Sequence, residues 1–241
     1  MRKYTGPDGI RLWIESVELE DLIHRELVGA DLLPDLDRPV VDVEGFVERH
    51  LLVQFDPYAD LAPAVLGETE FRVGNPVKIS INKDLTRAAM DDDESPLGIR
   101  GRWRATVAHE ATHVLLHRCL FDLCPEQATL FPVEDETASK AGRLQRCLKR
   151  DVIFGGRGGD WREIQANMGM GALLMPRALF TAAFEQEADR RGLRRIDRGS
   201  VHVAPLASAL ARRFEVSRQA ASIRLETLSL LAQPGQSLLT D

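Results

Sequence analysis

The sequence predicts a mixed α+β fold dominated by helices. Short strand-like runs are confined to the first hundred residues, whereas helical patterns fill most of the rest of the chain. The chain has 241 residues, of which 44% are hydrophobic and 28% are charged. This is enough for one large domain with a hydrophobic core, or for one domain with a small appendage. These proportions exclude a collagen-like, low-complexity or disordered chain.

The first hundred residues predict two helices and a small sheet. Apolar residues recur at helical spacing over Trp13–Leu27, and Val43–His50 is predicted as a second, shorter helix. Three further runs favour strands: Leu51–Phe55, Phe71–Val73 and Val77–Ile81. The last run alternates as V-K-I-S-I, which predicts one buried and one solvated face, as on an antiparallel or edge strand.

The remaining residues predict helices separated by one irregular stretch. Strong helical patterns cover Arg102–Leu120 and Trp161–Met175. Between them, Cys119–Asp160 is predicted as irregular, and its glycine run Gly155–Gly159 is interpreted as a flexible connector or as a lid over a cleft. Val203–Leu231 is predicted as a helix, a tight turn and a second helix.

The composition favours a cytoplasmic protein without a membrane span. The apolar runs are far shorter than the roughly 20 residues that a membrane helix needs, and the N-terminus lacks the apolar core of a signal peptide. The three cysteines, Cys119, Cys124 and Cys147, are few and odd in number, so they do not suggest a secreted disulfide framework. We therefore expect buried thiols in a reducing compartment.

The helix predicted from Arg102 contains the motif HEATH at His109–His113. Two histidines four residues apart lie on one face of a helix, about one turn from each other, so both imidazoles can reach one metal ion. Glu110 would lie beside the ion without binding it, placed to take a proton from a water molecule that zinc acidifies. The alternative is a helix whose histidines face solvent or core carbonyl groups.

Two histidines do not complete a catalytic zinc site, which usually has three protein ligands. The metzincin pattern would require a glycine and a histidine three and six residues after His113. Those positions hold Leu116 and Cys119, so that pattern is excluded. The other option is a glutamate from a later helix, and Glu163 opens the run E-I-Q-A-N on the next strong helix. The alanine of this run would let two helices approach closely and present the carboxylate across the gap.

Several motifs in one order resemble the ImmA/IrrE family of metallo-endopeptidases. They are R-A-T-V-A-H-E-A-T-H (Arg104–His113), E-I-Q-A-N (Glu163–Asn167), L-L-M-P (Leu173–Pro176), the upstream strand Val77–Asn82, and downstream Leu210–Ser217 and Arg224-Leu225. HExxH alone is a short motif, but the ordered set is specific, and the resemblance covers roughly residues 40–230.

The resemblance implies a zinc peptidase in which His109, His113 and Glu163 bind Zn²⁺ and Glu110 is the catalytic base. It implies a zincin-like fold, with a small N-terminal sheet packed on the HExxH helix and a helix-turn-helix-like tail. We assign residues 1–192 to the peptidase domain, with an insertion at about 119–160, and residues 193–241 to the tail. Family members cut a helix-turn-helix repressor encoded nearby, so we expect such a protein partner and relief of repression.

The sequence also departs from the family pattern. Gly169 and Met170 stand where family members usually have Phe-Ala, and the spacing from His113 to Glu163 is long. Each glycine inside a helix weakens it by about 1 kcal/mol relative to alanine. The first departure concerns how the helix over Trp161–Met175 packs. The second concerns the assignment of Glu163 as the third ligand.

Two other classes of function stay open. Four arginines, Arg212, Arg213, Arg218 and Arg224, would suit a DNA-binding regulator with a structural metal site, or a platform for a protein partner. The helix from Arg218 is rich in Ala, Ile and Leu, which disfavours base reading. The second of these classes is an interaction protein, such as one half of a toxin–antitoxin-like pair, with a decayed active site.

His117 extends the histidine series by one more turn. It lies about 12 Å along the helix from His109, too far to join the same tetrahedron easily, so we expect it to pack against the ligands or to hold one of them. A separate structural zinc bound by His117 and the three cysteines is an alternative, although no C-x₂-C pair is present.

Overall fold

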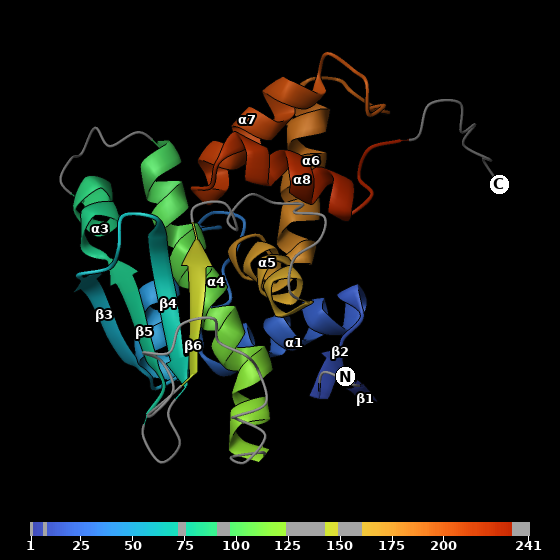
Figure 1. Ribbon diagram of the computed structural model, residues 1–241. Coiled ribbons are helices and arrows are strands. Elements are labelled where there is room, and N and C mark those ends of the chain that lie inside the picture. Colours follow the sequence, from blue (N-terminus) through green and yellow to red (C-terminus); the bar gives the residue numbers. More distant parts are fainter. Residues whose placement is uncertain are drawn as a thin grey trace.

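The computed structural model describes residues 2–6, 9–71, 76–90, 97–123, 143–148 and 161–232. A four-stranded sheet lies beside a long helix, with further helices on the other side of that helix (Figure 1). The predicted helix-dominated α+β class is confirmed. In chain order the elements are β1 (Arg2–Gly6), β2 (Gly9–Trp13), α1 (Ser16–Gly29), α2 (Val43–Gly45), η1 (Phe46–His50), β3 (Gln54–Ala59), β4 (Val65–Phe71), β5 (Lys78–Asn82), α3 (Lys83–Met90), α4 (Leu97–Leu123), β6 (Arg143–Leu148), α5 (Trp161–Leu174), α6 (Arg177–Arg190), α7 (Val203–Phe214) and α8 (Arg218–Thr227).

The N-terminus forms a hairpin before the first helix. Strands β1 and β2 pair antiparallel, with Lys3 opposite Leu12. The predicted helix over Trp13–Leu27 therefore begins later, at Ser16, because Trp13 is the last residue of β2. The backbone amide of Glu15 donates to the side chain of Glu18, which satisfies one of the amides left open where the helix begins.

The run V-K-I-S-I was predicted as an antiparallel or edge strand with one solvated face. It does pair antiparallel with β4, but it lies in the interior of the sheet, so the edge position and the solvated face are wrong. The strand order is β3-β5-β4-β6, and β5 pairs parallel with β3 and antiparallel with β4. Ser80 is only 4% exposed, so the side of β5 that was predicted to be solvated is largely buried too. The Lys78 ammonium lies 3.2 Å from the Asp56 carboxylate on β3, so its charge is paired within the sheet.

The stretch predicted as irregular contributes a strand to the sheet. Residues Arg143–Leu148 form β6, which pairs antiparallel with β4 from Arg143 opposite Phe71 to Leu148 opposite Val65. The prediction is wrong here because β6 is specified by its pairing with β4, which a local pattern does not show. The glycine run Gly155–Gly159 lies outside the described residues.

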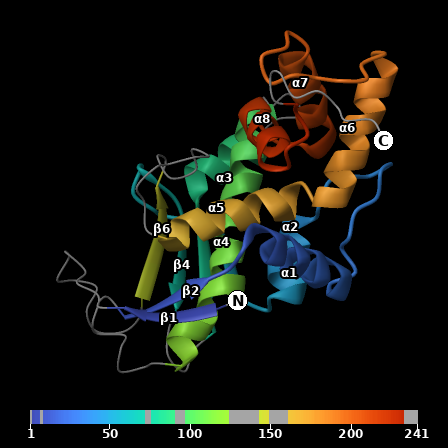
Figure 2. The ribbon, with the colours of Figure 1, turned by 90° about the vertical axis from the view of Figure 1, so that its right-hand side faces the viewer.

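Helix α4 is buried between the sheet and α5, which crosses it (Figure 2). Residues 103–114 are buried around the whole circumference, as expected for a helix covered on opposite sides, although several of them are polar. On the sheet side, Gly67 of β4 leaves no room for a side chain, since an added Cβ would lie 2.8 Å from Thr106 Cγ2 and 3.0 Å from Glu110 Oε1. The sheet therefore holds the HEATH segment at close range.

The approach of α5 to α4 depends on Gly169. A Cβ at this position would lie 2.3 Å from Thr112 Cγ2 in the HEATH motif, which is closer than real Cβ contacts allow. The departure from Phe-Ala at Gly169 and Met170 thus has a packing reason in this chain. It brings α5, and with it Glu163, against the HEATH motif.

Gly169→Ala is expected to destabilise the protein by about 1–3 kcal/mol, the usual cost of overpacking a core. Gly171→Ala is the matched control, because a Cβ there meets no atom within 4 Å. This control should gain up to about 1 kcal/mol from the higher helix propensity of alanine. Urea unfolding followed by circular dichroism measures both. Equal stability of the two variants would contradict the close approach of the helices.

The C-terminal segment forms the predicted helix, turn and helix. Helix α7 ends at Phe214, Glu215 adopts a left-handed conformation with φ of 52°, and the Ser217 hydroxyl accepts a hydrogen bond from the backbone amide of Ala220 at the start of α8. Phe214 packs on Phe180 of α6 with ring centroids 5.2 Å apart. These helices share one hydrophobic cluster with the rest of the described chain. The division at residues 192 and 193 stays a prediction.

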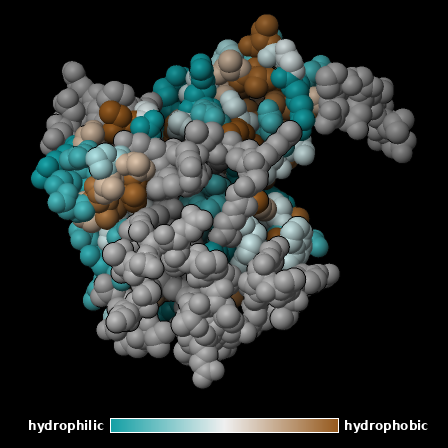
Figure 3. All heavy atoms as spheres, viewed as in Figure 1, coloured by the Kyte–Doolittle hydropathy of each residue, from teal (hydrophilic) through white to brown (hydrophobic). Residues whose placement is uncertain are grey.

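Figure 3 shows one face of the molecule coloured by hydropathy. Over its coloured residues, exposed hydrophobic side chains form separate groups that hydrophilic side chains surround. Among the described residues, Val201 and Leu52 are the most exposed large hydrophobics, at 82% and 75%. None of the helices in the described ranges combines the length and hydrophobicity that crossing a membrane requires.

Candidate metal centre

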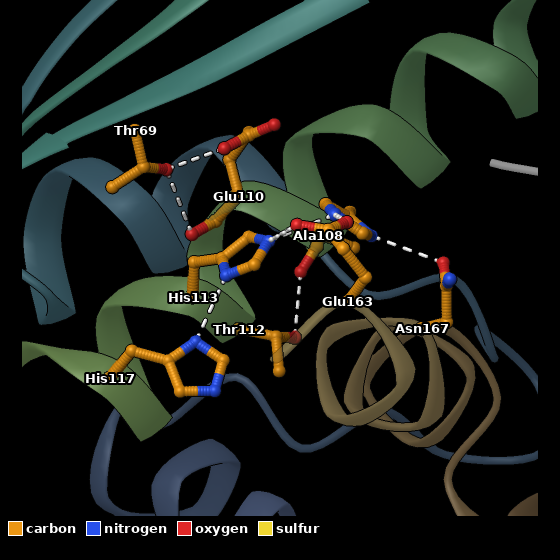
Figure 4. Close-up of polar contacts among 9 residues, drawn as sticks. Thr69, Ala108, Glu110, Thr112, His113, His117, Glu163 and Asn167 are labelled. Carbon is orange, nitrogen blue, oxygen red and sulfur yellow. Dashed lines mark hydrogen bonds and ion pairs between the residues drawn. The ribbon is translucent and has the colours of Figure 1, made fainter. Parts of the chain in front are cut away.

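The two histidines of the HEATH motif and Glu163 meet where α4 and α5 cross (Figure 4). His109 Nε2 and His113 Nε2 are 3.0 Å apart. Glu163 Oε2 lies 3.1 Å from His109 Nε2, and Glu163 Oε1 lies 3.3 Å from His113 Nε2. The structure thus brings together the three residues predicted as ligands, across the long spacing between His113 and Glu163.

The surroundings of His109 determine where its proton lies. Its Nδ1 is 3.1 Å from Asn167 Oδ1, and a side-chain amide oxygen can only accept a hydrogen bond. The proton of neutral His109 therefore resides on Nδ1. Its Nε2 lone pair then faces Glu163 and His113.

Burial and the glutamates set the charge of the site. Burial lowers the pKa of His113 to about 4. Burial also works against protonation of His109, but the hydrogen bond that Glu163 accepts and the charges of Glu110 and Glu163 outweigh it and raise the pKa of this imidazole. Burial works against ionisation of Glu163, but hydrogen bonds with both histidines outweigh it and hold its pKa well below its usual range. An ionised carboxylate thus lies against two imidazole nitrogens, and its negative charge favours a positive charge at the site.

This donor set fits a zinc ion. Two imidazole nitrogens and one carboxylate are a known catalytic ligand set, which keeps a fourth position for water or substrate. His109 and His113 have fully buried side chains, whereas that of Glu163 is 14% exposed. Across residues 2–6, 9–71, 76–90, 97–123, 143–148 and 161–232, this is the one group of three metal-ligating side chains within reach of a common ion.

Glu110 lies on the sheet side of α4, where a residue of β4 forms a hydrogen bond with one of its carboxyl oxygens. The Thr69 hydroxyl donates to Glu110 Oε2 at 2.5 Å. The other oxygen, Oε1, is buried and has no hydrogen-bond partner. Burial raises the pKa of Glu110 to about 8, against the opposing effects of His109 and Thr69. The carboxyl therefore has one oxygen fixed by Thr69 and one buried oxygen without a hydrogen-bond partner.

Three polar side chains that support the site were not predicted. Asn167 follows Glu163 by one helical turn, so helical spacing alone could have placed it beside the ligands. Gln165 contacts His117, with 3.3 Å from His117 Nε2 to Gln165 Oε1. Thr69 belongs to β4, and only the tertiary fold brings it to Glu110, 41 residues away.

The arginines proposed for DNA or a protein partner have different surroundings. Arg224 is 3% exposed and binds Glu20 of α1. Arg213 donates to the Gln186 side chain and to the Leu36 carbonyl. Arg212 and Arg218 are exposed. Two of the four are therefore engaged within the fold, and Arg224 is not accessible to a partner.

Of the three cysteines, only the side chain of Cys119 is described, and it is partly rather than fully buried. The Cys119 thiol lies 3.7 Å from the Leu116 carbonyl, within its own helix. Cys147 belongs to β6, opposite Gly67 of β4. Cys124 lies outside the described residues.

A HExxH helix joined by a glutamate from a second helix has the pattern of side chains that is typical of a metallopeptidase site. Comparison with protein families agrees: residues 147–226 match the Peptidase_M78 family model, described as the IrrE N-terminal-like domain. The match confirms the resemblance to the ImmA/IrrE family and supports a peptidase. It includes Glu163, Gln165 and Asn167 and begins after the HEATH helix. Comparison with curated proteins gives no match.

Proposed function

We propose that this chain is a zinc-dependent endopeptidase with a zincin-like fold. His109, His113 and Glu163 would hold the ion, and Glu110 would act as general base. The observation that carries the proposal is the convergence of two imidazole nitrogens and a carboxylate within 4.8 Å of one another, beside a buried carboxyl that is not one of them. Such a cluster of acceptors calls for a cation, and its chemistry matches zinc.

Bound zinc would act as a Lewis acid that polarises the scissile carbonyl and acidifies water. The residues of the chain supply the proton transfers. As the water oxygen bonds to the carbonyl carbon, its proton passes to Glu110 Oε1, the oxygen without a partner. When the carbon–nitrogen bond breaks, Glu110 returns this proton to the leaving amine. A raised pKa suits both steps, because the carboxyl can accept and release a proton near neutral pH.

The proposed substrate is a helix-turn-helix transcriptional repressor in the cytoplasm. This part of the proposal comes from the resemblance to the ImmA/IrrE family, whose members relieve repression by cutting such proteins. The small number of cysteines favours a reducing compartment. The engaged state of Arg213 and Arg224 disfavours direct reading of DNA by the chain itself.

Metal analysis tests the site. The purified chain is expected to bind about one zinc ion per molecule in inductively coupled plasma mass spectrometry after zinc loading and gel filtration. His113→Ala should lose most of the metal, because one of three protein ligands is absent. His50→Ala is the matched control, since this histidine pairs with Glu26 away from the cluster. Equal zinc in the wild type and His113→Ala would refute the site.

A further inference from the structure

A line of hydrogen bonds continues from the candidate metal centre to the N-terminal hairpin. His113 Nδ1 lies 2.9 Å from His117 Nδ1, and His117 Nε2 lies 3.3 Å from Gln165 Oε1. The Gln165 amide nitrogen then donates to the backbone carbonyl of Leu12 at 2.6 Å. His117 and Gln165 are both buried, at 1% and 7% exposure, so water does not offer them alternative partners freely.

The direction of every bond in this line follows from its last member. The Leu12 carbonyl can only accept, so the Gln165 NH₂ group must be the end that faces it. The amide oxygen then faces His117, and the imidazole must donate from Nε2. Neutral His117 has no second proton, so its Nδ1 accepts, and the donor must be Nδ1 of His113. The reverse direction would place protons on both nitrogens of His117 and bury a positive charge against a neutral amide.

We propose that His117 is a positioning residue that, through Gln165 and the Leu12 carbonyl, holds His113 with its proton on Nδ1 and its Nε2 lone pair toward the metal. The inference rests on the proposed metal site. It assigns a role to a histidine that binds no metal itself. It also makes the N-terminal hairpin part of the support of a ligand that lies far along the chain.

This arrangement matters because an imidazole can carry its proton on either nitrogen. With the proton on Nε2, His113 would present a donor to the ion and could not bind it. A hydrogen bond from the distant nitrogen selects the binding tautomer and fixes the plane of the ring, and loss of such a partner usually weakens metal binding by about 10–100-fold. Asn167 acts on His109 in the same way, so both ligands have a partner that accepts at Nδ1.

Two substitutions of equal shape separate hydrogen bonding from packing. In His117→Asn, the amide oxygen is as many bonds from Cβ as the imidazole Nδ1, so it can still accept from His113. In His117→Leu, a methyl group takes that place and cannot accept. Competition with a chromophoric zinc chelator should show zinc affinity close to the wild type for His117→Asn and about 10–100-fold lower affinity for His117→Leu.

Thr106→Val controls for the general effect of losing a buried hydrogen bond in α4. The Thr106 hydroxyl bonds only within the helix, to the Arg102 carbonyl, so zinc affinity should not change. If His117→Asn and His117→Leu bind zinc equally, either as tightly as the wild type or equally weakly, the proposed acceptor role of His117 is wrong. Circular dichroism confirms that each variant tested is folded.

A second measurement does not depend on the metal. In metal-free protein at pH 7.5, long-range ¹H–¹⁵N correlation spectra of the histidine rings report which nitrogen carries the proton. The expected result is a proton on Nδ1 for His113 and on Nε2 for His117. The opposite tautomers would overturn the inference even if zinc binds. If the wild type binds no zinc but shows the expected tautomers, the proposed function fails and the hydrogen-bond line stands.

Discussion

Glu110→Gln is expected to lower the rate of substrate cleavage by about 10²–10⁴-fold while the protein keeps its zinc. The amide has the same shape as the carboxyl and can still accept the hydrogen bond from Thr69. It cannot take a proton from water, so the proposed general base would be lost. Because Glu110 is not among the three converging ligands, metal binding should not change. Cleavage of a repressor encoded beside the gene, followed by gel electrophoresis and mass spectrometry, measures the rate.

Glu68→Gln is the control for this experiment. Glu68 lies on β4 next to Thr69 and contributes to raising the pKa of Glu110, but it is not one of the three converging side chains. Its replacement removes the same charge close to the site and should change the rate little. Unchanged cleavage by the zinc-loaded Glu110→Gln variant would place the base elsewhere. Loss of zinc from this variant would show that Glu110 serves as a ligand.

The largest effect on stability is expected at the ion pair between Glu20 of α1 and Arg224 of α8. The two guanidinium nitrogens lie 2.5 and 2.8 Å from the carboxylate oxygens, and Arg224 also donates to the Met175 carbonyl. Both side chains are buried. Arg224→Met should lower the free energy of unfolding by about 3–5 kcal/mol, because it leaves a buried carboxylate without a partner. Guanidinium unfolding with fluorescence detection measures this loss.

Two further variants define the origin of that loss. Combining Glu20→Leu with Arg224→Met removes both charges, so the double variant should be more stable than Arg224→Met alone. Arg49→Met breaks the exposed pair with Asp42 and should cost no more than about 1 kcal/mol. A cost as small for Arg224→Met as for Arg49→Met would mean that Glu20 is solvated in the folded protein.

The helices and the three converging side chains were accessible to sequence analysis because their signals are local. The HEATH motif places two imidazoles on one face within one helical turn, and the apolar periodicity continues through Trp161–Leu174 around Glu163. The inner position of β5 was not accessible in the same way, since its alternation is also that of an edge strand. Strand β6 has a weak pattern of its own and depends on β4 across a long stretch of chain.

The supporting side chains show the same limit. Asn167 lies one turn from Glu163, so the helix itself brings it to the site. Thr69 and Leu12 reach the site only through the packing of β4 and of the hairpin against other elements. No local pattern distinguishes these residues from any other threonine or leucine. Sequence analysis therefore identifies groups with distinctive chemistry, and the tertiary fold determines which ordinary groups hold them.

The segment that matches the family begins inside β6 and contains only Glu163 of the three converging ligands. Expressed alone, such a fragment would lack β4, the strand on which β6 pairs, and α4, against which α5 is buried. It would expose the surface of α5 around Gly169, which α4 covers in the whole chain. Its Glu163 carboxylate would lack both neighbouring imidazoles. Fragments intended for crystallography or screening should therefore include the hairpin, the sheet and α4.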